Sequence, residues 1–364
     1  MTISISPTLF RSFLYRGGLV PYPKPLKVTI GLTNYCNVRC KSCAVWNIYE
    51  KDPERATDEM TLDQYQNLFE DLQGISYIEF TGGETFMRED IVEIFSTAAN
   101  RISSLKICSV TTNGLLTPVI LKRVRSMMAS LPSRVRLNIG VSIDGIPEVH
   151  FSQRRIPESF DRAMETFLGL REMAKEFKNL EPHIAYTIST YNGGQLSKFK
   201  EYLDNLDIRF EEVTIVYQHS GFLYRTSKAH IQNKEHVMSD VNFAIDNRNL
   251  IINKGLFHLV KSHFYKYYLA RLKQYISSPK KMIIPCAALT LSAYIDPYGD
   301  IYPCVIWSKK IGNIKESSFQ TIYRSMIAEQ VRKEVANEKC PNCWTPCEAQ
   351  PSYLMKLPRI LFGS

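Results

Sequence analysis

The chain has 364 residues, 45% of them hydrophobic, with nine cysteines and a formal net charge of +9. At roughly 150 residues per domain, this length predicts about two domains with a sizeable core. No apolar run approaches the ~18 residues of a membrane-spanning helix, and the chain does not open with a signal-peptide pattern. We therefore exclude a transmembrane protein and a disulfide-stapled secreted domain, and expect a cytoplasmic protein whose cysteines bind metal.

The net positive charge has two interpretations. It marks either an anionic partner, such as phosphate, nucleic acid or acidic lipid, or a lysine-rich solvated surface, which we favour. The chain has no concentrated basic run and no RNA-binding signature, so we expect no nucleic-acid partner.

Residues 1–25 are expected to form an N-terminal extension that ends in Pro21-Tyr22-Pro23-Lys24-Pro25. Prolines at this spacing exclude a helix there and predict an extended lead into the first strand. The apolar and basic residues between Leu9 and Arg16 favour packing across the main domain, with contact to a membrane surface as the alternative.

Residues 26–220 alternate strand-like and helix-like segments, the rhythm of a parallel sheet. The strand-like runs are Val28–Leu32, Tyr77–Phe80, Leu105–Thr111, Val135–Val141, His183–Ile188 and Glu212–Tyr217. The helix-like runs are Leu62–Leu72, Asp90–Asn100, Val119–Ala129, Phe160–Phe177 and Gln195–Asn205. Functional side chains of such folds collect at the carboxyl ends of the strands. A lone thiol within the third strand, Cys108, is expected to be a buried apolar residue.

Three cysteines follow the first strand at C-x3-C-x2-C spacing: Cys36, Cys40 and Cys43. A structural zinc site takes four nitrogen or sulfur ligands, and an iron–sulfur cube normally takes four cysteines. Three thiolates on a cube would leave one iron open for another ligand. A zinc knuckle and buried free thiols are the alternatives.

Two further strand ends carry polar motifs, Thr81-Gly82-Gly83-Glu84 after the second strand and Ser142-Ile143-Asp144-Gly145 after the fourth. With these motifs the chain resembles the radical S-adenosylmethionine (SAM) enzymes. The resemblance implies an α/β fold with a partial (β/α)6 TIM-like barrel. It also implies a 4Fe–4S cluster whose open iron binds SAM, and reductive cleavage of SAM to a 5′-deoxyadenosyl radical. An electron donor such as flavodoxin or ferredoxin is then the expected partner.

The same resemblance suggests the SAM contacts. Gly82, Gly83 and Glu84 match the motif that holds the SAM amino group, and Ser142 and Asp144 match an element near its ribose and carboxylate. Arg154 is either a partner for that carboxylate or a surface residue, and Asn113 in Thr-Asn-Gly either borders SAM or forms a turn. Ser42 stands where relatives carry an aromatic residue beside the adenine, so Tyr35 or Trp46 would have to compensate.

Tyr217 and His219 follow the sixth strand at the expected mouth of the active site. Either could exchange a proton with a substrate, although a structural role is favoured for His219. Residues 221–280 break the βα rhythm and are expected to form a helical connection. Within it, His258–Ile276 has an apolar stripe and a basic face, which favours core packing over contact with lipid or an acidic substrate.

Residues 281–364 are expected to form a small C-terminal domain with two short strands on either side of the turn at Pro297-Tyr298-Gly299. The C-x12-G-x4-C pattern from Cys286 to Cys304 resembles the start of the SPASM extension or its shortened twitch form. Five cysteines are present: Cys286, Cys304, Cys340, Cys343 and Cys347. They imply one auxiliary 4Fe–4S cluster with Cys340 and Cys347 competing for the last place, and zinc is the alternative. The cluster would take an electron from the substrate or would fix the domain.

Neither fold nor cofactor names the substrate. The sequence mildly favours a small molecule, sugar or lipid-linked substrate, because the auxiliary region is reduced and we see no leader-peptide-binding domain before the barrel. A peptide-modifying maturase of the SPASM type is the alternative, and a non-catalytic iron–sulfur scaffold is the third hypothesis. The apolar, basic segments Leu9–Arg16, His258–Ile276 and Tyr353–Phe362 raise a weaker hypothesis of a peripheral position at the inner face of the membrane.

Overall fold

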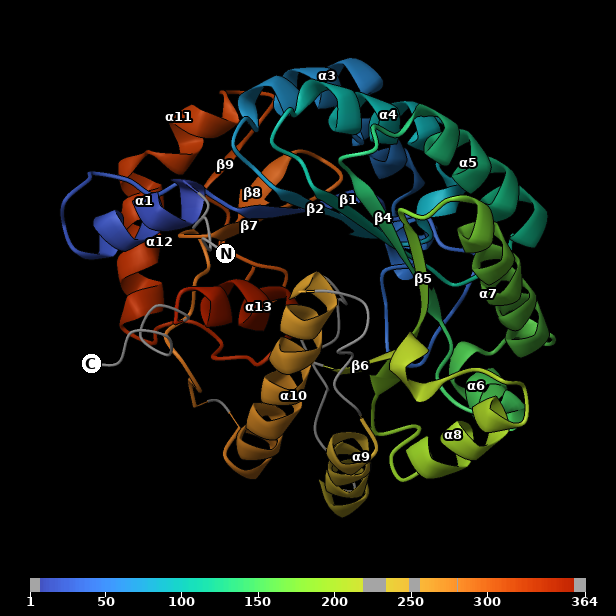
Figure 1. The fold of residues 1–364 in the computed structure, drawn as a ribbon. Helices are drawn as coiled ribbons and strands as arrows, with labels where there is room; N and C mark the ends of the chain where they lie inside the picture. Colours follow the sequence, from blue (N-terminus) through green and yellow to red (C-terminus); the bar gives the residue numbers. More distant parts are fainter. Residues whose placement is uncertain (1–6, 219–233, 249–255, 280, 357–364) are drawn as a thin grey trace.

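A computed structural model describes residues 7–218, 234–248, 256–279 and 281–356 of the chain. Strands and helices alternate around a curved sheet, with the helices on its outer side (Figure 1). In order, the elements up to β6 are α1 (Pro7–Arg16), β1 (Lys27–Thr33), α2 (Asn47–Lys51), α3 (Leu62–Asp71), β2 (Tyr77–Gly82), α4 (Ile91–Arg101), β3 (Ile107–Thr112), α5 (Thr117–Ser130), β4 (Arg136–Ser142), α6 (Pro147–Arg154), α7 (Ser159–Glu176), β5 (Leu180–Ile188), α8 (Leu196–Asp204) and β6 (Val213–Tyr217).

The first six strands are parallel and lie in chain order from β1 to β6. All six predicted strands and the five predicted helices between them are present, with ends that differ by at most three residues. The prediction of a partial TIM-like barrel in the α/β class is therefore confirmed.

Beyond β6 lie α9 (Lys234–Asp246), α10 (Leu256–Ser277), β7 (Ser292–Ile295), β8 (Asp300–Tyr302), β9 (Gly312–Asn313), α11 (Phe319–Tyr323), α12 (Met326–Ala336) and α13 (Pro346–Leu354). Strand β7 pairs in parallel with β1, and β8 and β9 follow in antiparallel pairing. The C-terminal strands therefore continue the barrel sheet, a pairing that the sequence did not predict. The free edge of β1 supplies the reason, because its backbone N–H and C=O groups need partners.

Helix α10 covers the other edge of the sheet, at β6. The Tyr265 hydroxyl bonds the backbone N–H and C=O of Ile215, and the Tyr268 hydroxyl accepts from Tyr217 N at 3.4 Å. Arg248, which follows α9, also reaches this edge, since its Nη1 donates to the carbonyl of Val213 at 2.8 Å. These side chains satisfy backbone groups that an edge strand otherwise leaves open.

The same helix reaches the C-terminal region, since the Trp344 indole N–H donates to the Tyr268 carbonyl and the two rings stack 6.0 Å apart. Helix α10 thus bridges the gap between β6 and the C-terminal region (Figure 1). The preferred interpretation of this helix, core packing, is confirmed for its described side chains, because Tyr268, Leu269 and Leu272 are fully buried.

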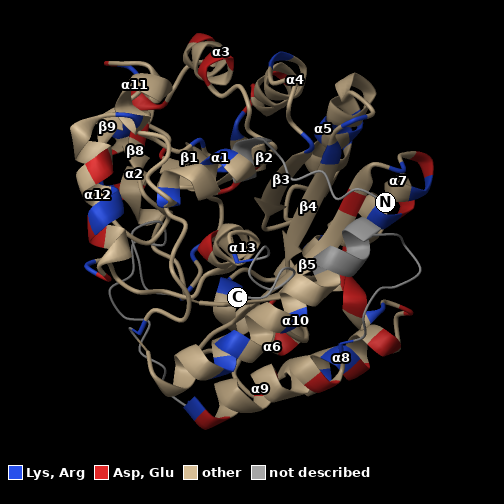
Figure 2. Ribbon diagram, turned by 60° about the vertical axis from the view of Figure 1, so that its left-hand side comes forward, with Lys and Arg blue, Asp and Glu red and all other residues tan. Residues whose placement is uncertain are grey.

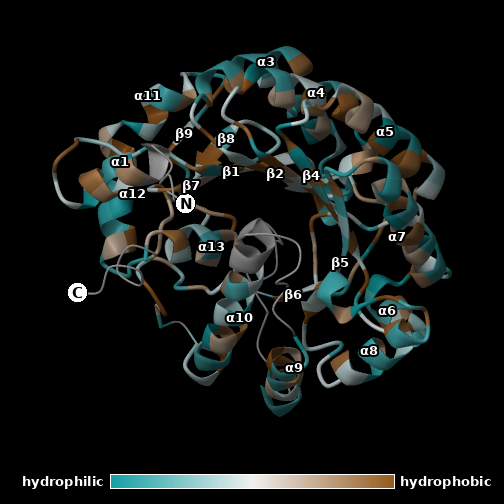
Figure 3. Cartoon of the chain, viewed as in Figure 1, coloured by the Kyte–Doolittle hydropathy of each residue, from teal (hydrophilic) through white to brown (hydrophobic). Residues whose placement is uncertain are grey.

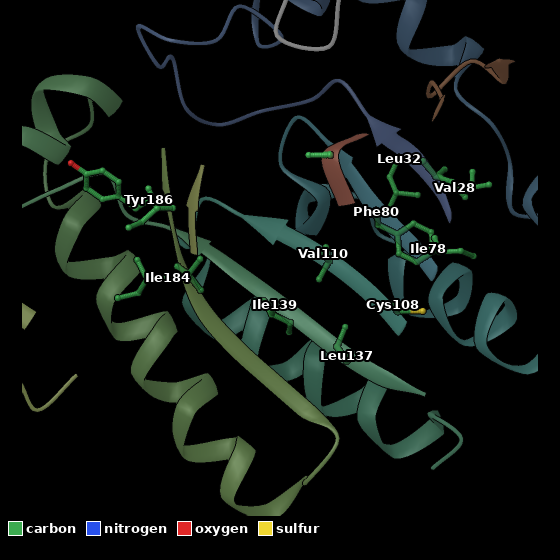
Figure 4. Close-up of a cluster of buried hydrophobic side chains, with 14 of the residues drawn as sticks. Val28, Leu32, Ile78, Phe80, Cys108, Val110, Leu137, Ile139, Ile184 and Tyr186 are labelled. Carbon is green, nitrogen blue, oxygen red and sulfur yellow. The ribbon is translucent and has the colours of Figure 1, made fainter. Parts of the chain in front are cut away.

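The main core lies between the sheet and its outer helices. Val28, Ile78, Cys108 and Leu137 are register neighbours on four adjacent strands and are all fully buried (Figure 4). Cys108 is therefore the buried apolar residue that the sequence predicts.

The inner face of the sheet is different. On the central strand β3, Thr111 is exposed, while Val110 beside it is buried. A side chain on a central strand can be exposed only where the face of the sheet is open, so the barrel interior is open at the carboxyl ends of the strands. Figure 3 shows hydrophilic residues along the strands β4 and β5.

The N-terminal residues pack on the C-terminal region through α1, where the Tyr15 hydroxyl donates to Glu329 of α12 at 2.9 Å. Residues 21–25 contain no helix, as the prolines predict. Charged residues of both signs alternate over the outer helices (Figure 2). In the described part of the chain, no helix combines the length and the apolar character needed to cross a bilayer.

Candidate SAM-cluster site and auxiliary cluster site

The loop after β1 gathers the first three cysteines. Cys36, Cys40 and Cys43 pack around Val38 and Leu115 in one small apolar cluster. Burial raises the thiol pKa to about 12 at Cys36 and about 11 at Cys43, while the backbone N–H groups of Val38 and Val45 act in the opposite direction. The site therefore combines exclusion of water with backbone donors directed at sulfur.

Arg154 adds a cation to this site. Its Nη1 lies 3.6 Å from the sulfur of Cys40, and its other nitrogens hold the buried carboxylate of Asp144 at 2.6 and 2.8 Å. The sequence suggested that Arg154 binds the SAM carboxylate. In the structure, it contacts a cysteine of the loop and the aspartate of the S-x-D-G element, so it joins two of the predicted motifs.

The loop after β2 lies directly against the cysteine loop. Gly83 N donates to the Thr33 carbonyl at 2.7 Å, and Glu84 N donates to the Tyr35 carbonyl at 2.6 Å. A Cβ atom on Gly82 would meet the Thr33 carbonyl oxygen at 2.2 Å, and one on Gly83 would meet that of Tyr35 at 2.0 Å. Only glycine fits at these two positions, and for Gly82 a φ of +138° adds a second reason.

Glu84 differs from the sequence expectation. Its carboxylate is 1% exposed and accepts hydrogen bonds from Phe86 N (3.1 Å), Thr112 Oγ1 (2.7 Å) and Asn113 N (2.7 Å). Burial raises the pKa of this carboxyl, and the three donors oppose the shift. The side chain that was expected to face an ammonium group instead ties the end of β2 to the end of β3.

Asn113 completes this connection. Its amide nitrogen donates to Asn37 Oδ1 at 2.7 Å, and its side-chain oxygen accepts from Leu115 N at 3.0 Å. The residue therefore forms the turn after β3, which is one of the two alternatives left by the sequence. It also contacts the cysteine loop, where SAM was expected to bind.

At the end of β4, Ser142 is partly exposed, and Asp144 is fully buried against Arg154. Asp144 Oδ1 also accepts from Thr187 N at 3.2 Å, which links this element to β5. Behind it, His150 Nδ1 accepts from Asp144 N at 3.1 Å. Burial lowers the pKa of His150 to about 4, so the ring is neutral at pH 7 and can accept this bond.

Two glutamines that the sequence analysis missed hold the cysteine loop across the barrel mouth. Gln218 follows β6 and donates from Nε2 to the Ser42 carbonyl at 2.8 Å, while Gln153 Nε2 lies 3.4 Å from the Ser42 hydroxyl. Ser42 thus has polar partners where relatives carry an aromatic residue. Polar residues at strand ends were a usable signal for Gln218.

Tyr35 is the aromatic side chain that the loop leaves open. It is 48% exposed, and its ring lies 4.7 Å from that of Tyr49 in an edge-on contact. Trp46 is tied back instead, because its indole N–H donates to the Cys43 carbonyl at 2.7 Å. Of the two suggested replacements for the missing aromatic residue, Tyr35 is the more exposed.

The proposed proton-exchange residues are not brought together. Tyr217 is 8% exposed and lies against Tyr275 of α10, with ring centroids 6.5 Å apart, so it faces α10 rather than the expected mouth. Burial raises its pKa. His219 lies outside the described residues.

The C-terminal cysteines form a second site. One pocket is lined by Cys286, Cys304, Cys340 and Cys343, with Pro303, Trp307, Trp344 and Glu348 among its other walls. The fifth cysteine, Cys347, is not a lining residue of this pocket. Its thiol lies near Glu79, whose carboxylate is paired with Lys27 at 2.5 Å and accepts from Thr29 at 3.2 Å. Cys347 also packs against the same apolar cluster as Cys286 and Cys343. Because Cys340 lines the pocket and Cys347 does not, we favour Cys340 as the fourth ligand of the auxiliary cluster.

Comparison with known families gives a match for each site. The model of the radical SAM superfamily matches residues 30–180, and the model of the SPASM iron–sulfur cluster-binding domain matches residues 286–344. The chain belongs to the radical SAM superfamily. It carries a SPASM domain as well, so the resemblance drawn from the motifs is confirmed, and the protein is a radical SAM enzyme.

Two relatives align over most of this radical SAM chain. The subtilosin biosynthesis protein AlbA of Bacillus subtilis is 22% identical over 91% of the chain and 68% of its own length. The AdoMet-dependent heme synthase of Nitratidesulfovibrio vulgaris is 26% identical over 87% of the chain and 83% of its own length. Among solved structures, Streptococcus suis SuiB bound to SAM has a TM-score of 0.59 at 15% identity, covering 88% of this chain and 70% of SuiB, which shows a shared fold.

The two domains imply a SAM-binding 4Fe–4S cluster, SAM and an auxiliary iron–sulfur cluster. The residues present fit these groups, because each site has free thiols in a confined apolar setting, with backbone donors near the first set. No three His, Cys, Asp or Glu side chains of the described ranges converge as a mononuclear metal site. A cube distributes its thiolates over several irons, so its ligands need not meet at one point.

The neutral His150 ring predicts a pH effect on stability. Its pKa is about 4 in the folded protein, below the usual value of 6.5, so its contribution is complete above pH 6.5 and is lost as the pH falls toward 4. Between pH 7.5 and 5.5 we expect the wild type to lose about 1 kcal/mol through this group. The His150→Gln variant, which cannot titrate here, should show a flatter dependence in thermal unfolding. Equal slopes for the two proteins would contradict this assignment.

Glu84 gives a second prediction. Glu84→Gln replaces one acceptor oxygen with an N–H2 group that faces donors, so we expect about 2–4 kcal/mol of lost stability together with weaker SAM binding. Glu89→Gln is the matched control, since Glu89 is exposed. Thermal unfolding and SAM titration on the same preparations separate the two effects. If SAM affinity falls while stability does not, the carboxylate contacts SAM directly.

Proposed function

We propose that this radical SAM enzyme modifies a peptide. The observation that carries the proposal is the combination of a radical SAM barrel and a SPASM domain in one chain that aligns over 91% of its length with AlbA, a bacteriocin biosynthesis protein. SuiB, which shares the fold, has also been solved bound to a precursor peptide. These relatives support the peptide alternative better than the small-molecule substrate that the sequence alone favoured.

We assign Cys36, Cys40 and Cys43 to the SAM-binding cluster and Cys286, Cys304, Cys340 and Cys343 to the auxiliary cluster. Gly82, Gly83, Asn113, Ser142 and Asp144 would form the SAM-binding edge of the barrel, with Tyr35 beside the adenine. When bound, the first cluster supplies the electron that cleaves SAM, and the auxiliary cluster supplies an electron acceptor or a structural anchor.

The residues of the chain hold these groups in place and keep water away. The Glu84 and Asn113 bonds fix the ends of β2 and β3 to the cysteine loop, and the Ser42 contacts close the loop toward β6. The open inner face, with Thr81 partly exposed and Thr111 exposed, offers hydroxyl groups to the amides of a peptide. We place the protein in a reducing, cytoplasmic compartment, since its nine cysteines are free thiols.

Co-expression with any short peptide that is found encoded beside its gene tests this function. We expect such a peptide to change mass in cells with the wild type, and to keep its mass in cells with the Cys36→Ala and Cys286→Ala variants. A small molecule is the second candidate, favoured by the similarity to the heme synthase. Unchanged peptides with a Cys36-dependent change in a small metabolite would select that candidate.

A further inference from the structure

Reductive cleavage of SAM needs one electron from outside the protein, and the surface around Cys40 suggests where that electron enters. Two segments lie around Cys40, residues 36–43 and residues 151–156. Together they contain Arg39, Lys41, Arg154 and Arg155 and no acidic residue. Two carboxylates lie close by, since Glu50 pairs with Arg39 and the buried Asp144 pairs with Arg154. In the part of the chain that the structure describes, neither Lys41 nor Arg155 forms an ion pair with a carboxylate, so this surface is basic.

The two segments are joined to each other. Lys41 N donates to the Gln153 carbonyl at 3.0 Å, and Lys41 Nζ donates to Ser152 Oγ at 3.1 Å. Ile156, at the end of the second segment, packs against the apolar cluster that contains Cys40. The surface is thus built onto the cysteine site and does not belong to a separate loop.

Exposed aromatic side chains lie within this basic surface. Phe151 is 49% exposed and Tyr191 is 48% exposed, and the Lys41 ammonium lies 5.8 Å from the centroid of the Tyr191 ring. Aromatic and arginine side chains are the residues that carry binding energy in protein–protein contacts, while charges around them steer the encounter. The combination indicates a surface for a transient protein partner rather than a solvated loop.

The short distance between this surface and the buried Cys40 supports the same interpretation. Cys40 is only 9% exposed, yet it is the chain neighbour of Arg39 and Lys41, and Arg154 Nη1 reaches its sulfur. A protein bound at Lys41 and Arg155 therefore lies close to the cluster site, since both residues adjoin the segments that hold Cys40 and Arg154.

We propose that Arg39, Lys41, Phe151, Arg155 and Tyr191 form the docking surface for an acidic one-electron carrier protein of the flavodoxin or ferredoxin type. One electron passes from the reduced carrier, which is oxidised by one electron, to the SAM-binding cluster; no atom is transferred, and the electron is used to cleave SAM. The proposal rests on the radical SAM chemistry and does not depend on the peptide substrate.

Charge reversal tests the surface with two readouts. The Kd for a purified, oxidised flavodoxin is measured by calorimetry at low and high salt, for the wild type and for Lys41→Glu, Arg155→Glu and the double variant. We expect the Kd of each single variant to rise about tenfold at low salt and less at high salt, because the interaction is electrostatic. Lys106→Glu is the control, since Lys106 is exposed just before β3, at the opposite end of the sheet from the cysteine loop.

The second readout compares two reductants. Formation of 5′-deoxyadenosine should fall in the variants when reduced flavodoxin is the electron source and should equal the wild type with dithionite, which needs no docking surface. If Lys41→Glu loses iron because of its place between two cysteines, Arg155→Glu, outside that loop, decides. An unchanged Kd for Arg155→Glu, or the same loss in Lys106→Glu, would overturn the proposal. A failure of the peptide experiment would leave this result untouched.

Discussion

Replacing Cys36, Cys40 and Cys43 together with alanine should remove about four of roughly eight irons and abolish SAM cleavage. Replacing Cys286, Cys304, Cys340 and Cys343 should remove a similar amount but leave the SAM-binding cluster in place. The physical reason is the separation of the two thiol sets into different surroundings, one around Val38 and Leu115 and the other around the C-terminal pocket.

Cys347 is the internal control for this experiment. Cys347 does not line the pocket, so Cys347→Ala should retain all the iron that Cys343→Ala loses. Iron analysis and the visible iron–sulfur absorbance of anaerobic preparations measure both. Loss of about four irons in Cys347→Ala, with full iron in Cys340→Ala, would reverse the ligand assignment.

Gly83→Ala should lower SAM cleavage by about a hundredfold, although it adds a single methyl group. That methyl group would lie 2.0 Å from the Tyr35 carbonyl oxygen, a backbone atom that already accepts from Glu84 N. The two loops must separate, and a displacement of about 1 Å in a catalytic site costs on the order of 10²-fold in rate.

The matched control is Gly193→Ala. Gly193 lies in the loop after β5. A Cβ atom at this position would be 3.4 Å from its nearest neighbours, which is an ordinary contact. We expect this variant to cleave SAM at the wild-type rate. Production of 5′-deoxyadenosine by reduced, iron-loaded protein measures both variants, and wild-type activity in Gly83→Ala would show that the contact between the loops is dispensable.

The sequence predicted the barrel well because its strands and helices carry their own periodic patterns. The six strands and the cysteine spacing could be found without tertiary information. The pairing of β7 with β1 could not, since the partners are more than 260 residues apart and short strands have little local signal. The sequence predicted the C-terminal domain itself but not that its strands extend the barrel sheet.

The roles of individual site residues were harder to predict. Glu84 was expected to face SAM, but its partners, Thr112 and Asn113, come from another strand, and a motif does not show where its carboxylate points. Tyr217 was expected at the mouth and lies against α10, because strand alternation gives two faces without saying which one a later helix will cover. Gln218 and Gln153 were missed because their common partner, Ser42, is identified only by the fold.

The segments proposed for membrane contact have other partners where they are described. Tyr15 in the first bonds Glu329, and α10 buries Tyr268 and Leu272 in the core. Tyr353, at the start of the third, is 3% exposed, and residues 357–362 lie outside the described ranges. The apolar patterns that suggested a lipid surface are therefore used for packing at these positions.

The most direct test of the account is the fate of SAM itself. Anaerobically reconstituted wild-type protein, reduced with dithionite, should convert SAM into equal amounts of 5′-deoxyadenosine and methionine, slowly even without a substrate. The Cys36/Cys40/Cys43→Ala variant under the same conditions should produce neither. A wild-type protein that carries its full iron, accepts the electron and still forms no 5′-deoxyadenosine would contradict the assignment of this chain as a radical SAM enzyme.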